Sequence, residues 1–233
     1  MSSASPAAPA GAGAVEAVIF DYGGVISVRL LGDLSNFEAT MGYPTGSVTE
    51  LMFGPSGVTD GAPVHDFHAL EMGQLSLAEY LAGLERRAPE VLGRPLDLSA
   101  YRAFTAASAI AVHWPVVHRV RRLRDDGVRL ALLTNNVREF GDAWRATFPV
   151  NELFPTVVDS CEVGMRKPDP RIYEHTCALL EVEPTVAVFL DDNEDNVDAA
   201  AALGLETVHF GADPVVSLTE LDEILDRRGI KPR

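Results

Sequence analysis

Four short apolar runs, with helical patterns between them, constrain the fold of this chain most strongly. The runs are rich in Val, Ile, Leu and Phe, which favour strands, and they lie at 15–20, 128–133, 156–158 and 186–190. Segments with helical spacing lie at 114–124, 138–147, 172–180 and 194–203. Strands that alternate with helices in this way form a parallel sheet that helices cover on both faces. The sequence therefore predicts an α/β fold with a doubly wound, Rossmann-like parallel sheet.

The long segment between the first and second runs follows a different pattern. Residues 31–112 contain amphipathic helical stretches at 77–87 and 98–107, separated by clusters of Gly and Pro. We interpret this segment as a helical cap inserted after the first strand. The α/β core would then consist of residues 15–30 and 113–233.

Composition sets limits on the function. The 233 residues are 47% hydrophobic, which is enough for a large core, and the net charge of −15 argues against nucleic acid or an anionic membrane as a partner. Residues 1–14 are nearly all Ala, Ser, Pro and Gly, so we expect a disordered tail. Only two cysteines are present, Cys161 and Cys177, which favours buried thiols in a reducing compartment over a disulfide scaffold.

Targeting signals are not recognisable in this sequence. The start of the chain lacks the basic residues and apolar run of a secretory signal, and no stretch of about 18 apolar residues could span a bilayer. We therefore predict a cytoplasmic protein with small-molecule partners. The sequence carries no signal for an oligomeric state.

Polar residues follow the predicted strands at the points where ligands bind in open parallel sheets. The first strand ends at Asp21, which Tyr22 and two glycines follow. A carboxylate there can act as a covalent nucleophile, and an aspartate that caps a turn is the alternative. The second strand leads into Thr134 and Asn135, whose hydroxyl and N–H groups could hold phosphate oxygens or simply form a turn.

Two further motifs carry opposite charges. Asp169 and the proline after it resemble a helix start, which would leave Lys167 outside the helix and directed into the crevice, whereas a solvated lysine is the alternative. We interpret Arg166 as structural or peripheral. The fourth run ends in a carboxylate cluster, and we predict that Asp192 binds Mg²⁺, a hard cation that prefers oxygen ligands. Capping of the following helix by Asn193 or Asp195 competes with that interpretation.

The order of these motifs resembles the four signature motifs of the haloacid dehalogenase-like superfamily. The resemblance covers about residues 15–210, and the segments GMRKPDPRIY and FLDDNEDNVDAAAALG look like the branch of bacterial α-glucose-1-phosphate phosphatases and the phosphatase domain of soluble epoxide hydrolases. It implies a magnesium-dependent hydrolase of a small phosphorylated metabolite, acting through an aspartyl-phosphate.

The resemblance also implies a role for each residue. Asp21 would be the nucleophile, and Lys167 would balance charge at the nucleophile and the phosphoryl group. Thr134 and Asn135 would bind substrate oxygens. The ligands of Mg²⁺ would be the carboxylates of Asp21 and Asp192 and the backbone carbonyl of Gly23.

One position departs from the family pattern. Gly23 stands where most phosphatases of the superfamily place a second aspartate, the general acid for the leaving group, whose loss typically costs about 10²–10⁴ in rate. Three consequences compete. The substrate has a leaving oxygen that needs little protonation, as in a sugar 1-phosphate; a cap residue such as His65, His68 or Glu71 supplies the proton; or the chain has lost turnover and only binds ligand.

Two rival functions follow from these observations. A catalytically weak or inactive protein with this fold would act in binding or regulation, although retention of Asp21, Lys167 and Asp192 favours chemistry. A 2-haloacid dehalogenase would use the same aspartate on carbon without a metal. The acidic cluster at Asp191 and Asp192 argues against that activity.

Overall fold

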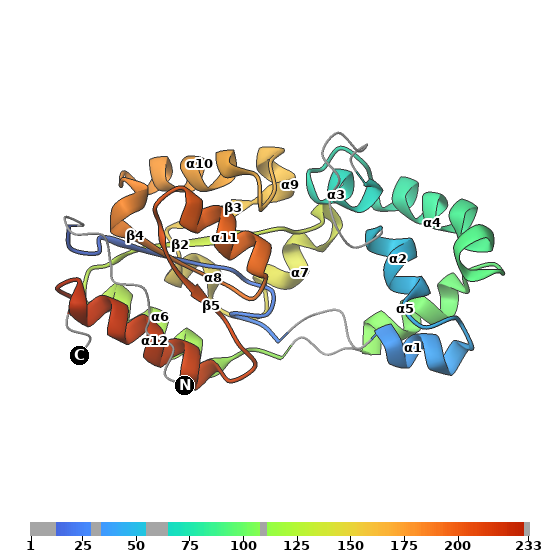
Figure 1. The fold of residues 1–233 in the computed structure, drawn as a ribbon, viewed down its shortest axis with the longest axis horizontal. Coiled ribbons are helices and arrows are strands. Elements are labelled where there is room, and N and C mark those ends of the chain that lie inside the picture. The colour runs from blue at the N-terminus through green and yellow to red at the C-terminus, as the bar shows by residue number, and fades with distance from the viewer. Residues whose placement is uncertain (1–12, 29–33, 55–64, 108–110, 231–233) are drawn as a thin grey trace, which may run out of the picture.

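A five-stranded parallel sheet forms the centre of the α/β part of the protein (Figure 1). The computed structural model describes residues 13–28, 34–54, 65–107 and 111–230. The predicted tail at 1–14 therefore lies almost wholly outside the described residues. The strands, in the spatial order β3-β2-β1-β4-β5, are β1 (Ala17–Phe20), β2 (Arg129–Thr134), β3 (Thr156–Asp159), β4 (Ala187–Asp191) and β5 (Glu206–His209).

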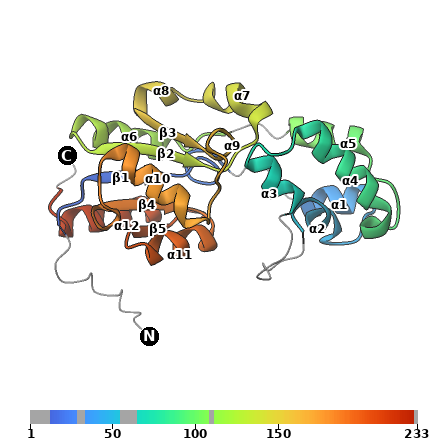
Figure 2. The same ribbon diagram turned by 90° about the horizontal axis from the view of Figure 1, so that it is seen from above.

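Successive side chains of the central strands enter two different cores. Val18 and Phe20 of β1 pack in a cluster with residues of α6 (Trp114–Asp125) and α12 (Pro214–Arg227). Ala17 and Ile19 enter a second cluster with residues of α10 (Pro170–Leu180) and α11 (Glu194–Ala202). Both faces of the sheet are therefore covered, as Figure 2 shows, because side chains alternate along a strand. The predicted doubly wound α/β fold is confirmed.

Of the described helices between β1 and β2, the first five form a separate bundle beside the carboxyl edge of the sheet (Figure 1), whereas α6 packs on the sheet. We call these five helices the helical bundle: α1 (Leu34–Met41), α2 (Ser47–Phe53), α3 (Asp66–Glu71), α4 (Leu77–Leu92) and α5 (Leu98–Ala107). The bundle has its own apolar core, which includes Phe37, Leu51 and Leu84, and Val137 of the loop after β2 joins it. The predicted domain limit between residues 30 and 31 falls within 29–33, outside the described residues, and the limit between 112 and 113 lies just after 108–110, which are also not described, so both limits stay a prediction.

The helices after β2 are short. They are the 3₁₀ turn η1 (Arg138–Phe140), α7 (Gly141–Arg145), α8 (Val150–Leu153) and α9 (Ser160–Val163), and a further 3₁₀ turn, η2 (Pro184–Val186), precedes β4. A single helix was expected at 138–147, but the chain there begins as a 3₁₀ turn without a side-chain cap at Val137. Strand β5 has no counterpart among the four predicted apolar runs, since this edge strand keeps only Val208 fully buried.

Within the described part of the chain, no helix is both long and apolar enough to cross a membrane. Cys161 and Cys177 are free thiols buried in the protein. The cytoplasmic location stays a prediction.

Candidate active site

Three neighbouring strands bring polar side chains together at the carboxyl edge of the sheet. Asp21 directly follows β1, while Thr134 and Asp191 are the last residues of β2 and β4, which flank β1. All three side chains are buried. The parallel register aligns Phe20 of β1 with both flanking strands, so their carboxyl ends meet at one point. This is the edge at which open parallel sheets bind ligands.

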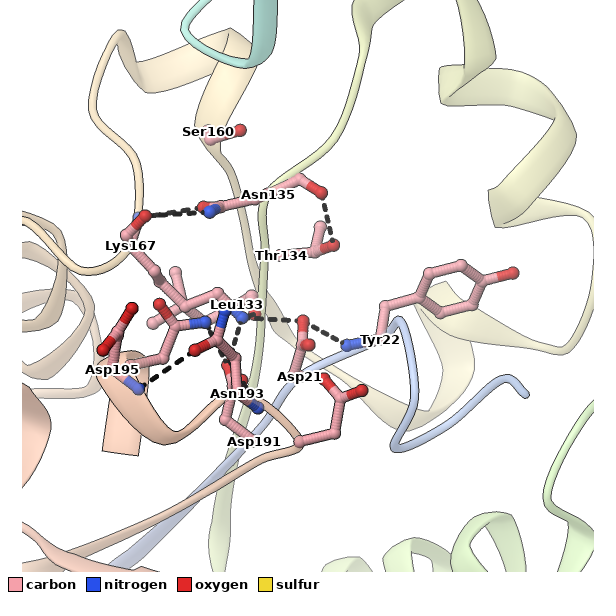
Figure 3. A network of polar contacts seen from close by, with 12 residues as sticks. Asp21, Tyr22, Leu133, Thr134, Asn135, Ser160, Lys167, Asp191, Asn193 and Asp195 are labelled. Atoms are coloured by element: carbon pink, nitrogen blue, oxygen red, sulfur yellow. Dashed lines mark hydrogen bonds and ion pairs between the residues drawn. The ribbon is translucent and has the colours of Figure 1, made fainter. Parts of the chain in front are cut away.

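Lys167 reaches this point from the loop that precedes α10. Its ammonium nitrogen lies 2.7 Å from a carboxylate oxygen of Asp21 and 2.6 Å from one of Asp191, and it donates a 3.1 Å hydrogen bond to the carbonyl of Leu133. Figure 3 shows this network. The Lys167 side chain is only 1% exposed, and its partners offset the cost of removing a cation from water.

Side chains of Asn135 and Asp169 explain why the loop that carries Lys167 has this shape. The Asn135 amide group holds its backbone on both sides: its oxygen accepts a hydrogen bond from the Lys167 N–H and its nitrogen donates to the Lys167 carbonyl, each at 2.9 Å. Asp169 caps α10 and Pro170 is its first residue, as predicted. Asn135 therefore uses its side-chain amide to position Lys167. The predicted role of holding substrate oxygens is then assigned to its backbone N–H.

Three carboxylates lie close to one another at the site, and two of them contact Lys167. One oxygen each from Asp21, Asp191 and Asp192 lies within 4.8 Å of the others, a spacing that suits a metal ion. Gly24 lies against Asp192: its φ is +85°, and a Cβ atom there would come within 2.2 Å of a carboxylate oxygen of Asp192. A glycine is thus required at this position for two independent reasons.

Asp191 and Asn196 belong to the site although the sequence analysis assigned neither a role. The Asn196 side-chain nitrogen lies 3.0 and 3.1 Å from the two carboxylate oxygens of Asp191, and the Asn193 N–H donates to one of them at 2.8 Å. Asn193, not Asp195, caps α11. The two consecutive aspartates at the end of β4 could have indicated Asp191 from the sequence. Asn196 could not be identified in this way, because its place at the site depends on how α11 is rotated about its axis.

The electrostatics reflect an excess of negative charge. Burial raises the pKa of Asp21 to about 8; Lys167 opposes this shift, and Asp191 and Asp192 add to it. Burial acts to lower the pKa of Lys167, but the carboxylates of Asp191 and Asp21 outweigh it, so that its pKa is raised and it stays charged. Three clustered carboxylates with a single ammonium between them leave a site that a divalent cation would neutralise.

The site opens into a pocket of about 370 Å³ between the sheet and the helical bundle. The sheet side contributes Thr134, Asn135 and Lys167, together with Asp21, Tyr22, Gly23, Asn136, Arg166, Asp192, Asn193 and Asn196, and the bundle contributes Phe53, Phe67, His68 and Glu71. All predicted site residues therefore line one pocket. Their chemical roles stay predictions.

Arg166 was interpreted from sequence as structural or peripheral, and its contacts agree with the structural alternative. Its side chain lines the pocket, and its Nε atom donates a 2.7 Å hydrogen bond to Glu71 of α3. The bundle holds two more contacts with the core: Ser160 donates to the Glu71 carbonyl at 2.6 Å, and Glu139 accepts from the Leu77 N–H at 2.8 Å. The bundle thus closes one side of the pocket.

The three residues proposed to supply a proton differ in position. His65 caps α3 through Nδ1 and is not among the pocket-lining residues, whereas His68 and Glu71 are. Burial, together with the charge of Arg166 and the neighbouring His65, lowers the pKa of His68 to about 4. Burial raises the pKa of Glu71, and Arg166 opposes that shift.

The fold and pocket define an α/β protein whose carboxylate-rich site lies at the carboxyl edge of a parallel sheet, beneath an inserted helical bundle. The chain belongs to the haloacid dehalogenase-like hydrolases, whose family model matches residues 15–204. The resemblance inferred from the four motifs is confirmed.

Curated relatives agree with this assignment. The chain is 29% identical to mouse acyl-CoA dehydrogenase family member 10 over 90% of its length and 26% identical to pig bifunctional epoxide hydrolase 2 over 91%. It spans only 19% and 39% of those two proteins. A phosphoglycolate phosphatase of Pectobacterium atrosepticum is 24% identical over 63% of this chain and 64% of that protein.

A solved structure supports the fold. The chain resembles a haloacid dehalogenase family enzyme from Bacteroides thetaiotaomicron, in complex with magnesium and inorganic phosphate, with a TM-score of 0.60. Sequence identity is 22%, and the match covers 83% of this chain and 92% of the Bacteroides chain.

Proposed function

We propose that this protein is a magnesium-dependent phosphomonoester hydrolase that acts on a small phosphorylated metabolite. The observation that carries the proposal is the position of Asp21, whose carboxylate lies 2.7 Å from the Lys167 ammonium and lines the pocket with Thr134 and Asn135. A nucleophile, a cation and hydrogen-bond donors in one pocket are what phosphoryl transfer requires.

In the proposed reaction, a carboxylate oxygen of Asp21 attacks phosphorus. The new oxygen–phosphorus bond forms as the bond to the leaving group breaks, which gives an aspartyl-phosphate and an alkoxide that takes a proton from solvent water to become the alcohol. A water molecule then attacks phosphorus and releases inorganic phosphate, which restores the carboxylate. Lys167 balances the charge of Asp21 and the phosphoryl group, while the Thr134 hydroxyl and the Asn135 N–H hold phosphoryl oxygens.

The donor set fits Mg²⁺. Oxygens of Asp21 and Asp192 and the Gly23 carbonyl would hold the ion, which suits a cation that takes one or two carboxylates besides waters and phosphate. Three carboxylates around one ammonium, together with the glycine that makes room for Asp192, support this assignment. When bound, the ion supplies positive charge that stabilises the phosphoryl group in transfer.

The lack of a strong proton donor for the leaving group limits which phosphate esters the site can hydrolyse. Gly23 offers no acid, and a histidine with a pKa of about 4, as at His68, holds no proton to donate at neutral pH. Glu71, the other candidate in the pocket, is paired with Arg166, which favours its ionised form. The site therefore favours esters whose leaving oxygen needs little protonation, such as a sugar 1-phosphate.

The test is phosphate release from phosphorylated sugars, nucleotides and a chromogenic ester, with Mg²⁺ and with a chelator. We expect chelator-sensitive release that the variant Asp21→Asn loses. An Asp21→Asn variant that hydrolyses esters at the native rate would rule out the mechanism. A folded protein that binds Mg²⁺ but releases no phosphate from any ester would favour a binding module, and release of halide from a 2-haloacid without a metal would favour dehalogenation.

A further inference from the structure

The wall of the pocket opposite Asp21 contains an ion pair that the proposed reaction does not use. Arg166, in the loop before α10, donates from Nε to Glu71 at the end of α3 over 2.7 Å. The two side chains are 20% and 9% exposed, respectively, so the pair is largely shielded from water. Both residues line the pocket, and the pair joins the bundle to the core.

The other bundle residues at this wall add no charge. Phe53 and Phe67 lie edge to face with their ring centres 4.7 Å apart and present apolar surface to the pocket. His68 is neutral at neutral pH because its pKa lies near 4. Among the described residues that line this wall, the charged side chains are therefore Glu71 and Arg166, which neutralise each other.

This arrangement acts against substrates that carry a second anion. A carboxylate or second phosphate on the leaving group would need Arg166 as its partner, but Glu71 accepts a hydrogen bond from the Arg166 Nε atom and offsets the guanidinium charge. Separating a buried pair leaves a desolvated carboxylate behind, which is costly. Without such a partner, the second anion would be buried beside Glu71 and close to the acidic cluster.

We propose that Glu71 is a specificity-determining residue, which occupies Arg166 and restricts the pocket to phosphomonoesters of uncharged alcohols with an apolar face. The inference rests on the proposed phosphatase function and names its substrate class. Phe53 and Phe67 receive the apolar face, while the Glu71–Arg166 pair excludes anionic leaving groups.

A matched pair of esters tests this inference. Phenyl phosphate and 4-carboxyphenyl phosphate differ by one carboxylate, and the ratio of their kcat/KM values measures discrimination against the anion. We expect the native protein to favour phenyl phosphate, and Glu71→Gln to raise the relative rate on the carboxylated ester about tenfold, the scale of one charged hydrogen bond. An unchanged ratio in Glu71→Gln would overturn the proposal.

Two further variants separate this effect from loosening of the bundle. Glu139→Gln removes a carboxylate that also contacts the bundle, through the Leu77 N–H, but is not among the pocket-lining residues, so the ratio is expected to stay native. In an Arg166→Gln background, Glu71→Gln should no longer improve use of the carboxylated ester, because the released cation is absent. An equal gain in that background would show that Arg166 is not the cause.

Binding of inert analogues distinguishes failure of this inference from failure of the proposed function. By calorimetry, benzylphosphonate should bind the native protein at least about tenfold more tightly than 4-carboxybenzylphosphonate, and Glu71→Gln should reduce the difference. Equal binding of the two by the native protein would overturn the specificity role and leave the phosphatase proposal intact. If the native protein bound neither phosphonate and hydrolysed no ester, both the specificity role of Glu71 and the proposed phosphatase function would be overturned.

Discussion

The ammonium nitrogen of Lys167 lies 2.7 Å from the Asp21 carboxylate, and both side chains are almost completely shielded from water. A second carboxylate, Asp191, lies 2.6 Å from the same nitrogen. Lys167 thus joins the loop before α10 to the ends of two neighbouring strands. The contacts proposed for chemistry are therefore also contacts that hold the carboxyl edge of the sheet together.

Replacement of Lys167 by Met should destabilise the protein. Two buried carboxylates would lose their cation, and removal of one partner of a buried pair typically costs about 3–5 kcal/mol. The free energy of unfolding from urea titration, with chelator present, measures the loss. Adding Asp191→Asn to Lys167→Met should restore part of the stability, because one stranded charge is removed. A loss as small as that of an exposed pair would contradict the burial argument.

Alanine at Gly24 should weaken binding of divalent cations, whereas alanine at Gly23 should not. A Cβ at position 24 would come within 2.2 Å of an Asp192 oxygen and would occupy a backbone with φ of +85°, whereas a Cβ at position 23 meets nothing within 4 Å. We expect the Mg²⁺ affinity of Gly24→Ala to fall at least about tenfold, as when residues that position metal ligands are changed. Calorimetric titration of both variants checks this, and equal affinities would argue against Asp192 as a ligand.

Aspartate at Gly23 should restore a general acid. The open space around that position accepts a side chain, and Gly23 lines the pocket. The gain should be largest for alkyl phosphates, whose alkoxide leaves poorly, and could approach about 10²-fold in kcat, while aryl phosphates should gain little. Gly23→Asn serves as the isosteric control without an acidic proton. Equal gains for alkyl and aryl esters would show that proton donation is not the cause.

His68 should titrate with a pKa of about 4, below the ordinary value of 6.5. Between these two values the unfolded chain binds the proton more readily than the folded protein. Stability therefore rises with pH over that range and falls on acidification. His68→Gln should reduce this acid sensitivity in thermal melts between pH 4 and pH 6.5. NMR titration of the His68 ring gives the pKa directly, and a value above 6 would contradict the partly buried position of His68 near Arg166.

The positions of four strands and the four motifs could be predicted because they depend on local patterns. The apolar runs that end at Asp21, Thr134 and Asp191 identify strands and the edge where they converge, and Asp169 with Pro170 marks the start of α10. Strand β5 could not be found in this way, since an edge strand with one side in solvent lacks a continuous apolar run.

The site itself was predicted incompletely because side-chain partners depend on packing. Asn135 was expected to hold substrate oxygens through its backbone or side-chain N–H groups, and that role stays a prediction. The sequence did not indicate that its side-chain amide hydrogen-bonds the backbone of Lys167 on both sides. Arg166 was interpreted as structural or peripheral, but its partner could not be named, because nothing near it in sequence indicates that a residue 95 positions away will contact it.

The sequence by itself determined the α/β class, the insertion after the first strand and the residues that converge at the sheet edge, since each follows from short-range periodicity and the geometry of parallel strands. Only the tertiary structure decided that Lys167 lies between Asp21 and Asp191, that Gly24 makes room for Asp192 and that Glu71 forms an ion pair with Arg166. These contacts join segments distant in the chain, and the docking of the helical bundle against the sheet sets their distances and their exclusion of water.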